Sequence, residues 1–332
     1  GGESHHQVIE CRPRYLGRLG RDCSFARCVQ SVMQREKFDL VQSHERIAGC
    51  DIFRAGDGVH AAWLEQRRRR QGLIGRLGAW FSPWHRYTLA AERAMFADPR
   101  LKAVICISEL VRNDIRRFYG VADDKLQVIY NGIDLDRFHP ELALEHRAAI
   151  RRQHGIPESA PLFVYVGSGF ERKGVAPLLA AMAAATSSEL RLLVVGSEKD
   201  MGRYTRQAAS LGLGERVVFT GGVKDARPYY AAADAFVLPT LYEPLSNAAL
   251  EALACGLPSI LSEQCGAAEL LTSGVNGYVC DALDVAALAA HMSALAQPGV
   301  AAAMRPAARA AVAHLGLEAM SARLLELYRS LI

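Results

Sequence analysis

The chain has 332 residues, of which 50% are hydrophobic and 22% charged, and its formal net charge is +4 at pH 7. This length is sufficient for two domains of roughly 150 residues, each with its own hydrophobic core. No run of 18 apolar residues is free of charges, and the beginning shows no signal-peptide pattern, so the sequence predicts no membrane-spanning helix.

Strands and helices alternate along the whole chain. In the first half we expect strands at 7–11, 38–43, 50–53, 103–107 and 126–129, and helices at 22–36, 61–80, 84–97 and 108–119. In the second half we expect strands at 162–166, 190–195, 216–219, 235–238, 257–261 and 277–279, and helices at 175–186, 202–212, 226–233, 247–254, 266–272, 284–297 and 316–331. Alternation of this kind predicts an α/β fold with parallel sheets covered on both faces.

Basic and aromatic residues are concentrated between 60 and 100, where eight arginines face three acids and all three tryptophans occur. The side chains of interest are Trp63, Arg67, Arg68, Arg69, Arg70, Trp80, Phe81 and Trp84. Interleaved arginines and large aromatics favour a helix lying in an anionic membrane interface. The same composition also suits nucleic acid, or a surface helix with a packed aromatic face.

A glycine-rich turn with two cations follows the apolar run 162–166. It reads Gly167-Ser168-Gly169-Phe-Glu-Arg172-Lys173-Gly174 and precedes a predicted helix. A strand, such a turn and a helix together are typical of a diphosphate site, because helix amides and cations both attract the anion. Arg172 replaces the third glycine of the dinucleotide fingerprint, and the P-loop spacing is absent. The alternative interpretation is a solvated basic turn.

Two glutamates bracket a second segment, Glu243-Pro-Leu245-Ser246-Asn247-Ala248-Ala-Leu-Glu251. Ser246 or Asn247 is a good helix N-cap, so Glu243 falls in a loop and Glu251 on the second helical turn. A continuous helix would place them about 80° apart, whereas a loop followed by a helix can direct both into one cleft. The amides at 246–248 would lie between the two carboxylates, ready for an anion. A solvated loop glutamate plus a surface helix glutamate is the alternative.

Both segments together resemble the retaining glycosyltransferases of family 4. The segments 219–224 and 130–134 match that family as well, and the resemblance covers nearly the whole chain. Within the family, the chain is most similar to the lipopolysaccharide core glucosyltransferases, through the segments 53–60, 91–96 and 167–174. The resemblance implies the GT-B fold, in which two Rossmann-like domains face each other across a cleft. It places an acceptor-side domain at 1–138, a nucleotide-sugar domain at 139–315, and a helix at 316–332 that packs back toward the first domain.

The resemblance also assigns roles to individual residues. It implies that Glu251 binds the ribose and Glu243 the donor sugar, while Arg172 and Lys173 stabilise the leaving diphosphate without a metal. It implies that the base lies near Val223 and Lys224, and that phosphate and sugar are lined by Leu245, Ser246, Asn247 and Ala248. On the acceptor side, Asp57 or His60 is expected to orient the attacking hydroxyl or accept its proton. A capped turn before the helix at 61 would explain both residues without chemistry.

The expected reaction is transfer of a hexose from UDP-glucose or a similar donor to a lipid-linked saccharide, with retention and no cofactor or metal. A nucleotide-sugar 2-epimerase of the same fold and a non-catalytic membrane-associated binding protein remain alternatives. The expected location is the inner face of the inner membrane, facing the cytoplasm, with an anionic membrane surface and no nucleic acid as partner. The family's first strand, loop and helix have no counterpart here, which leaves the first sheet in question.

The eight cysteines show no metal-ligand spacing. Cys106, Cys255 and Cys280 lie within or beside apolar runs and are expected to be small buried hydrophobes. Cys23 and Cys28, five residues apart on a predicted helix, are not placed to form a disulfide with each other. A reducing compartment is the expectation.

Overall fold

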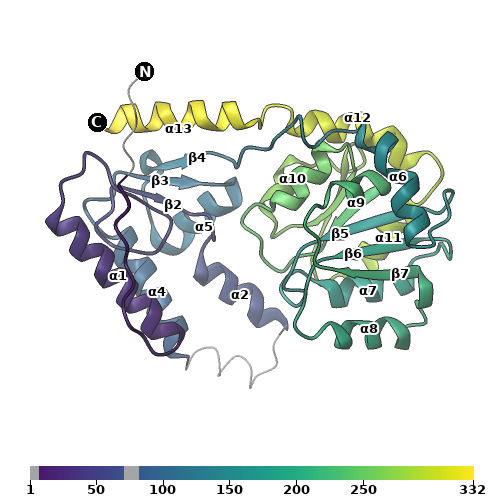
Figure 1. Ribbon diagram of the computed structural model, residues 1–332, viewed down its shortest axis with the longest axis horizontal. Coiled ribbons are helices and arrows are strands. Elements are labelled where there is room, and N and C mark those ends of the chain that lie inside the picture. Colours follow the sequence, from purple (N-terminus) through teal and green to yellow (C-terminus); the bar gives the residue numbers. More distant parts are fainter. Residues whose placement is uncertain (1–6, 71–81) are drawn as a thin grey trace. The chain divides into compact units, whose positions relative to one another are not determined.

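The computed structural model of the protein describes residues 7–70 and 82–332. The chain divides into two compact units, each with its own sheet (Figure 1). Unit 1 comprises Gly1–Cys106, Asn113–Gln127 and Arg329–Ile332, and unit 2 comprises Ile107–Arg112 and Val128–Tyr328. The domain boundaries expected at residues 138 and 315 stay predictions.

The sheet of unit 1 has the order β1-β2-β3-β4, and β1, β2 and β3 pair in parallel. Its strands are β1 (Gln42–Ser43), β2 (Ile52–Arg54), β3 (Ala103–Cys106) and β4 (Leu126–Val128). Its helices are α1 (Gly17–Arg35), α2 (His60–Arg70), α4 (Pro83–Phe96) and α5 (Glu109–Tyr119), of which α5 begins in unit 2; the short 3-10 helix η1 is Asp123–Lys125. The apolar run of β3 is fully buried, as expected for a parallel strand covered on both faces.

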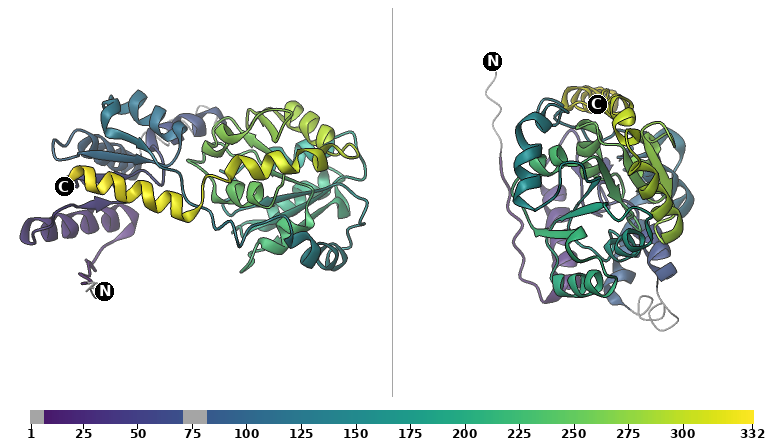
Figure 2. Two further views of the ribbon diagram at one scale, coloured as in Figure 1. Left: turned by 90° about the horizontal axis from the view of Figure 1, so that it is seen from above. Right: turned by 90° about the vertical axis from the view of Figure 1, so that its right-hand side faces the viewer.

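Helix α1 contacts α4, and α2 contacts α4 as well (Figures 1 and 2). The extended segment before α1 is joined to this helix by a disulfide between Cys11 and Cys28, whose Cα atoms are 5.9 Å apart. The expectation that the cysteines are all reduced is therefore wrong for this pair. The spacing of Cys23 and Cys28 carried no information about Cys11, which reaches Cys28 only because the segment folds back along α1.

The sheet of unit 2 has six parallel strands in the order β10-β9-β8-β5-β6-β7. They are β5 (Leu162–Val166), β6 (Arg191–Val195), β7 (Val217–Gly221), β8 (Ala235–Leu238), β9 (Ser259–Ser262) and β10 (Gly277–Cys280). The α-helices are α6 (Leu142–Gln153), α7 (Val175–Ala184), α8 (Met201–Ser210), α9 (Arg227–Ala232), α10 (Asn247–Ala254), α11 (Val285–Leu295), α12 (Val300–Val312) and α13 (Leu317–Leu331), and the 3-10 helices are η2 (Gly214–Arg216) and η3 (Gly266–Leu270). Helix α7 contacts α8 and α11, α6 contacts α9, and α10 contacts α12 (Figure 1).

The six strands and most of the helices of unit 2 match the sequence expectation within a few residues. Two helices were missed. Helix α6 buries only Leu142, Ile150 and Arg151, so its apolar stripe is weak, and α12 contains Pro306, which ordinarily interrupts a helix. The expected helix at 266–272 is instead the 3-10 helix η3.

The first half departs further from expectation. The strand expected at 7–11 is absent from the described structure, and Pro13, two residues beyond it, has no amide to donate to a sheet. The strand expected at 38–43 is reduced to β1, and α1 begins at Gly17 rather than at residue 22. Helix α2 ends at Arg70, and the remainder of the expected helix 61–80, together with Trp80 and Phe81, lies outside the described residues.

Within residues 7–70 and 82–332, no single helix is long and apolar enough to cross a membrane. Helices α11 and α12 meet that length and composition only together, and they are bent by 101°. The same residues contain no group of three or more His, Cys, Asp and Glu side chains arranged to hold a metal ion.

Candidate active site

The glycine-rich turn of unit 2 lies at the carboxyl end of β5 and leads into α7. Gly174, the N-cap of α7, has φ 77°, and a Cβ there would collide with the carbonyl oxygen of Pro239. Only glycine therefore fits this close approach. Phe170 is fully buried, and its amide donates to Glu198 at 2.8 Å. The turn is thus fixed at both ends while Ser168 and Gly169 stay at the surface.

The two cations of this turn converge on Glu243. Arg172 Nη1 donates to Glu243 Oε2 at 2.8 Å and to the carbonyl of Tyr242 at 2.8 Å. Lys173 Nζ lies 3.3 Å from the same carboxylate oxygen. Side chains 71 residues apart in sequence thus form one charged cluster. Because parallel strands end at the same edge of a sheet, the loops after β5 and β8 meet there.

The helix after Glu243 begins with a strained cap. Ser246 has φ 75°, the only positive φ outside glycine in the described residues, and its Oγ accepts the amide of Ala249 at 3.2 Å. Such a conformation costs about 1–3 kcal/mol and is typical of functional sites. The Asn247 side chain accepts a hydrogen bond from Asn131 at 2.8 Å. The first turn of α10 is thereby fixed, and the helix begins at Asn247, shortly after Glu243 in the chain.

Glu251 lies on the second turn of α10, as expected. The Tyr230 hydroxyl donates to Glu251 Oε2 at 2.8 Å, and Tyr230 is itself fully buried. Burial raises the pKa of Glu251, although the hydrogen bond from Tyr230 opposes this shift. One carboxylate oxygen of Glu251 is therefore oriented by a protein partner. Tyr230 itself gave no signal in the sequence.

The remaining donor-side candidates differ in exposure. Val223 and Lys224 lie in the loop after β7, with Lys224 exposed. Leu245 is buried and its carbonyl accepts the amide of Ala267 at 3.0 Å, whereas Ala248 is half-buried. Gly167 lies at the end of β5, where its amide donates to Val195 at 2.8 Å.

Two backbone hydrogen bonds that the sequence did not reveal fix the loop carrying Glu243. The amide of Glu243 donates to Gln264, and the amide of Gly266 donates back to Glu243, both at 2.9 Å. Glu269 accepts the amides of Glu109 and Leu110 at 3.0 and 3.3 Å and so caps the start of α5.

In unit 1, Asp57 lies after β2 and its side chain is 79% exposed. Arg46 Nη1 lies 3.8 Å from it, while Arg46 Nε donates to the buried Glu92 at 2.8 Å. Glu92 also accepts from the His60 amide at 2.8 Å and the Tyr119 hydroxyl at 2.5 Å. The exposed carboxylate thus stands beside a guanidinium that is anchored from within the core. Arg46 and Glu92 were missed in the sequence because they are 46 residues apart.

His60 occupies a different environment from Asp57. It is 6% exposed, and its Nε2 lies 3.0 Å from His85 Nδ1. Burial, followed by the charge of Arg46, lowers the pKa of His60 from 6.5 to about 3. His60 is thus a neutral, enclosed imidazole, whereas the carboxylate of Asp57 is exposed.

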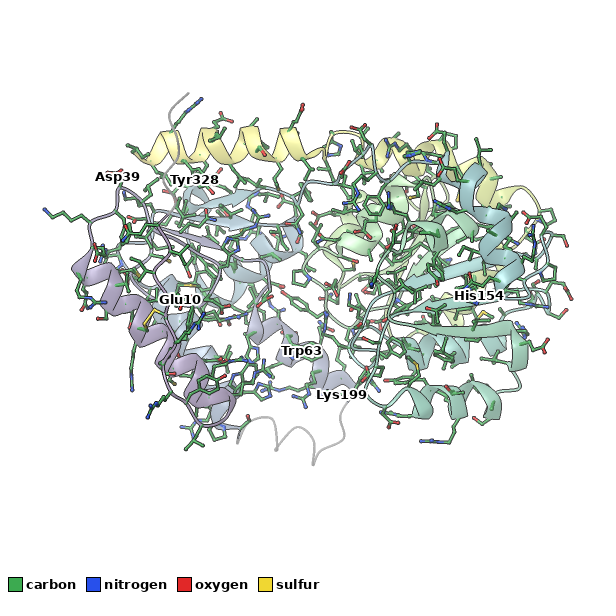
Figure 3. The ribbon with its side chains drawn as sticks, viewed as in Figure 1. Glu10, Asp39, Trp63, His154, Lys199 and Tyr328 are labelled. Carbon is green, nitrogen blue, oxygen red and sulfur yellow. A yellow bond between two sulfur atoms is a disulfide. The ribbon has the colours of Figure 1, made fainter. Side chains whose placement is uncertain are left out.

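The basic and aromatic side chains of α2 and α4 divide into two groups. Arg68 and Arg69 are exposed. Trp63, labelled in Figure 3, is half-buried on the same helix. Trp84 is held inside unit 1, because its Nε1 donates to Asp22 at 2.8 Å and the Arg18 guanidinium lies 3.5 Å from its ring centroid. Arg67 Nη1 lies 3.1 Å from His85 Nε2. Arg68 and Arg69 are therefore exposed, whereas Trp84 is bonded within unit 1.

Two family models match the chain: "Glycosyl transferases group 1" over residues 146–311, half of the chain, and "Glycosyltransferase Family 4" over residues 2–137. The chain belongs to the group 1 glycosyl transferases. The crystal structure of WaaG, a glycosyltransferase involved in lipopolysaccharide biosynthesis, superposes with a TM-score of 0.81 and 26% identity, covering 96% of this chain and 85% of that one. The fold class expected from the sequence, α/β of the GT-B type, is confirmed.

This group 1 glycosyl transferase is similar to three further proteins in sequence or in fold. Lipopolysaccharide glucosyltransferase WaaG of Escherichia coli is 28% identical over 263 residues, which are 78% of this chain and 68% of that protein. Lipopolysaccharide core biosynthesis glycosyltransferase LpsE of Rhizobium meliloti is 36% identical over 40% of this chain and 39% of its own length. Anabaena HepE, solved with UDP-glucose, shares the fold with a TM-score of 0.70 and 19% identity, covering 98% of this chain and 85% of that one.

Proposed function

We propose that this glycosyltransferase moves a hexose from a nucleoside diphosphate sugar, UDP-glucose or a close analogue, to a lipid-linked saccharide of the lipopolysaccharide core type. The observation that carries the proposal is the cluster of Arg172, Lys173 and Glu243, continued by the capped helix that bears Glu251. The names of the WaaG and LpsE relatives support the class of acceptor.

The donor half of the reaction follows from charge. When the bond between the anomeric carbon and the diphosphate breaks, negative charge grows on the leaving oxygens. Arg172 and Lys173, together with the first amides of α10, stabilise that charge, so the proposal requires no metal ion. Glu243 binds hydroxyls of the sugar, and Glu251 those of the ribose.

The acceptor half requires a hydroxyl that attacks the anomeric carbon from the side the leaving group vacates, which retains the configuration. Asp57 orients this hydroxyl, and the hydroxyl proton passes to the departing diphosphate. No side chain is placed as a covalent nucleophile in this proposal. The exposed arginines of α2 attach the protein to the anionic inner face of the inner membrane, where a lipid-linked acceptor is held.

A transfer assay tests the proposal. The protein is incubated with radiolabelled UDP-glucose, with and without delipidated lipopolysaccharide core oligosaccharide. We expect label in the oligosaccharide only when both substrates are present. Turnover of the donor alone would favour the epimerase alternative, and no turnover of either kind would contradict an enzymatic role.

Replacement of Arg172 by alanine probes the leaving-group role. We expect kcat to fall by the equivalent of about 2–4 kcal/mol in transition-state stabilisation, because the guanidinium acts where charge develops. Arg152→Ala, which removes an exposed arginine of α6 in the same unit, serves as the matched control. Near-normal kcat in Arg172→Ala would remove this residue from the mechanism.

A further inference from the structure

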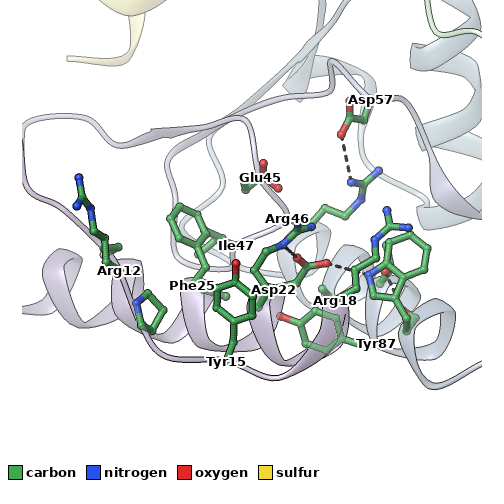
Figure 4. A pocket seen from close by; sticks show the side chains of 17 residues that line it. Arg12, Tyr15, Arg18, Asp22, Phe25, Glu45, Arg46, Ile47, Asp57 and Tyr87 are labelled. Carbon is green, nitrogen blue, oxygen red and sulfur yellow. Dashed lines mark hydrogen bonds and ion pairs between the residues drawn. The ribbon is translucent and has the colours of Figure 1, made fainter. Parts of the chain in front are cut away.

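A pocket of about 660 Å³ lies within unit 1 (Figure 4). Its walls come from the extended segment 11–15, from α1, from α4, and from the loops that follow β1 and β2. The disulfide between Cys11 and Cys28 ties the extended segment to α1 and so fixes one wall. A volume of this size falls within the range of about 300–1,000 Å³ that is typical of small-ligand sites.

Part of the pocket lies at the carboxyl ends of strands, where ligands of parallel sheets usually bind. Glu45, Arg46 and Ile47 follow the carboxyl end of β1, and Asp57 follows that of β2. Figure 4 shows Arg46 and Asp57 turned toward each other at one end of the pocket, with Arg12 at the opposite end. Asp57, the residue that we assign to the acceptor hydroxyl, therefore lines the pocket itself.

The charges of the lining are largely balanced. Three of its four arginines are paired with carboxylates: Arg12 with Glu10, Arg21 with Asp22, and Arg46 with Glu92. The fourth, Arg18, stacks on Trp84 at 3.5 Å and has no carboxylate partner among the described residues. The lining also contains the three carboxylates Asp22, Glu45 and Asp57, so it has little excess positive charge, and its one oriented guanidinium suits a hydroxyl-bearing ligand.

The other lining groups suit the same ligand. Glu45 and Asp57 are exposed carboxylates, which can accept hydrogen bonds from ligand hydroxyls, and the Arg18 guanidinium can donate to ligand hydroxyl oxygens. The aromatic rings of Tyr15, Phe25 and Tyr87 supply apolar surface between these polar groups. Apolar walls with a few donors and acceptors of both kinds match a molecule that alternates C–H faces and hydroxyls.

We propose that this pocket binds a saccharide unit of the acceptor, adjacent to the sugar whose hydroxyl Asp57 orients. Arg18 and Glu45 bind the hydroxyls of this unit. Arg46, which is itself paired with the buried Glu92, lies 3.8 Å from Asp57 and positions it. The inference rests on the proposed function, because it names where that function's acceptor is held. It makes Arg18 a residue that determines which acceptor is used.

The experiment titrates delipidated core oligosaccharide into the protein by calorimetry, without donor, and then measures transfer from UDP-glucose. Arg18→Ala is expected to raise the Kd of the oligosaccharide and the acceptor KM about tenfold, the loss of one charged hydrogen bond, and to leave the Kd of UDP unchanged. Arg35→Ala, at the other end of α1, is the matched control. Ala91→Trp, which fills the pocket from α4, is expected to weaken the oligosaccharide at least as much.

The outcomes separate this inference from the proposed function. Unchanged Kd and acceptor KM in both Arg18→Ala and Ala91→Trp would overturn the pocket assignment while transfer still stands. Oligosaccharide binding that depends on Arg18, in a protein without transfer activity, would support the pocket and contradict the transferase proposal. Absence of oligosaccharide binding to the unaltered protein would overturn the inference.

Discussion

At the scale of single residues, Glu251 is expected to contribute measurably to the affinity for the nucleotide. Tyr230 orients one of its oxygens, and the other is free to accept a ribose hydroxyl in the proposal. Glu251→Gln keeps the shape but removes the charge, so we expect the affinity for UDP to fall about tenfold or more, the worth of a charge-assisted hydrogen bond. Calorimetric titration of UDP checks this, with Glu318→Gln on α13 as a control. Equal affinities would exclude Glu251 from the nucleotide site.

His60 predicts how stability depends on pH. Its pKa is lowered to about 3 in the folded protein, first by burial, whereas the unfolded chain titrates near 6.5. The folded state therefore binds this proton less tightly, and the stabilisation present above pH 6.5 is lost at about 1.4 kcal/mol per unit as the pH falls toward 3. Urea unfolding of the protein and of His60→Gln between pH 4 and 7 measures this slope.

We expect a flatter pH profile for His60→Gln than for the unaltered protein. His44→Gln, at an exposed histidine, serves as the control and keeps the original slope. Identical slopes in the protein and in His60→Gln would show that another group is responsible.

Residues of the site were predictable from the sequence where they lie close together in it. Arg172 and Lys173 share one turn, and Glu243 with Glu251 bracket one segment, so their chemistry was readable without a fold. Tyr230 and Glu269 were not, because their partners are 21 and about 160 residues away. Such pairs exist only once the topology brings distant loops to one sheet edge.

At the scale of elements, α2 predicts membrane attachment. Arg68 and Arg69 are exposed on its last turn. Replacing both with serine removes two charges and is expected to weaken binding to anionic vesicles by about 1 kcal/mol per charge before salt screening. Vesicle co-sedimentation measures the effect, with Arg152→Ser as the control for charge alone. Unchanged binding would leave α2 as a solvated helix.

Elements were predictable where burial and periodicity agree. The strands of unit 2 are continuous apolar runs, and β5 and β8 have the expected bounds. Helix α6 was missed because a buried arginine, Arg151, interrupts its apolar face, and this guanidinium is satisfied by Asp234 at 2.8 Å and by backbone carbonyls. A pattern of hydrophobic residues does not reveal a core position filled by a paired charge.

At the scale of the whole molecule, each unit has its own parallel sheet and its own core. Val104 and Ile105 are fully buried in unit 1, as are Val164 and Leu193 in unit 2. We therefore expect two unfolding transitions rather than one. The chain supplies a selective reporter, because the two tryptophans that the structure describes, Trp63 and Trp84, belong to unit 1, and the third is at position 80 of the sequence.

Donor binding should act on only one of these transitions. The proposed nucleotide groups all belong to unit 2, so UDP at 100 times its Kd stabilises that unit by about 2.7 kcal/mol. In thermal unfolding, far-UV circular dichroism should show one transition moving to higher temperature, while the tryptophan fluorescence midpoint stays in place. A fluorescence midpoint that moved as far as the dichroism midpoint would contradict a donor site confined to unit 2. Delipidated oligosaccharide should instead raise the tryptophan fluorescence midpoint and leave the transition of unit 2 in place. The reason is that the groups proposed to bind it, Arg18 and Asp57 among them, lie in unit 1.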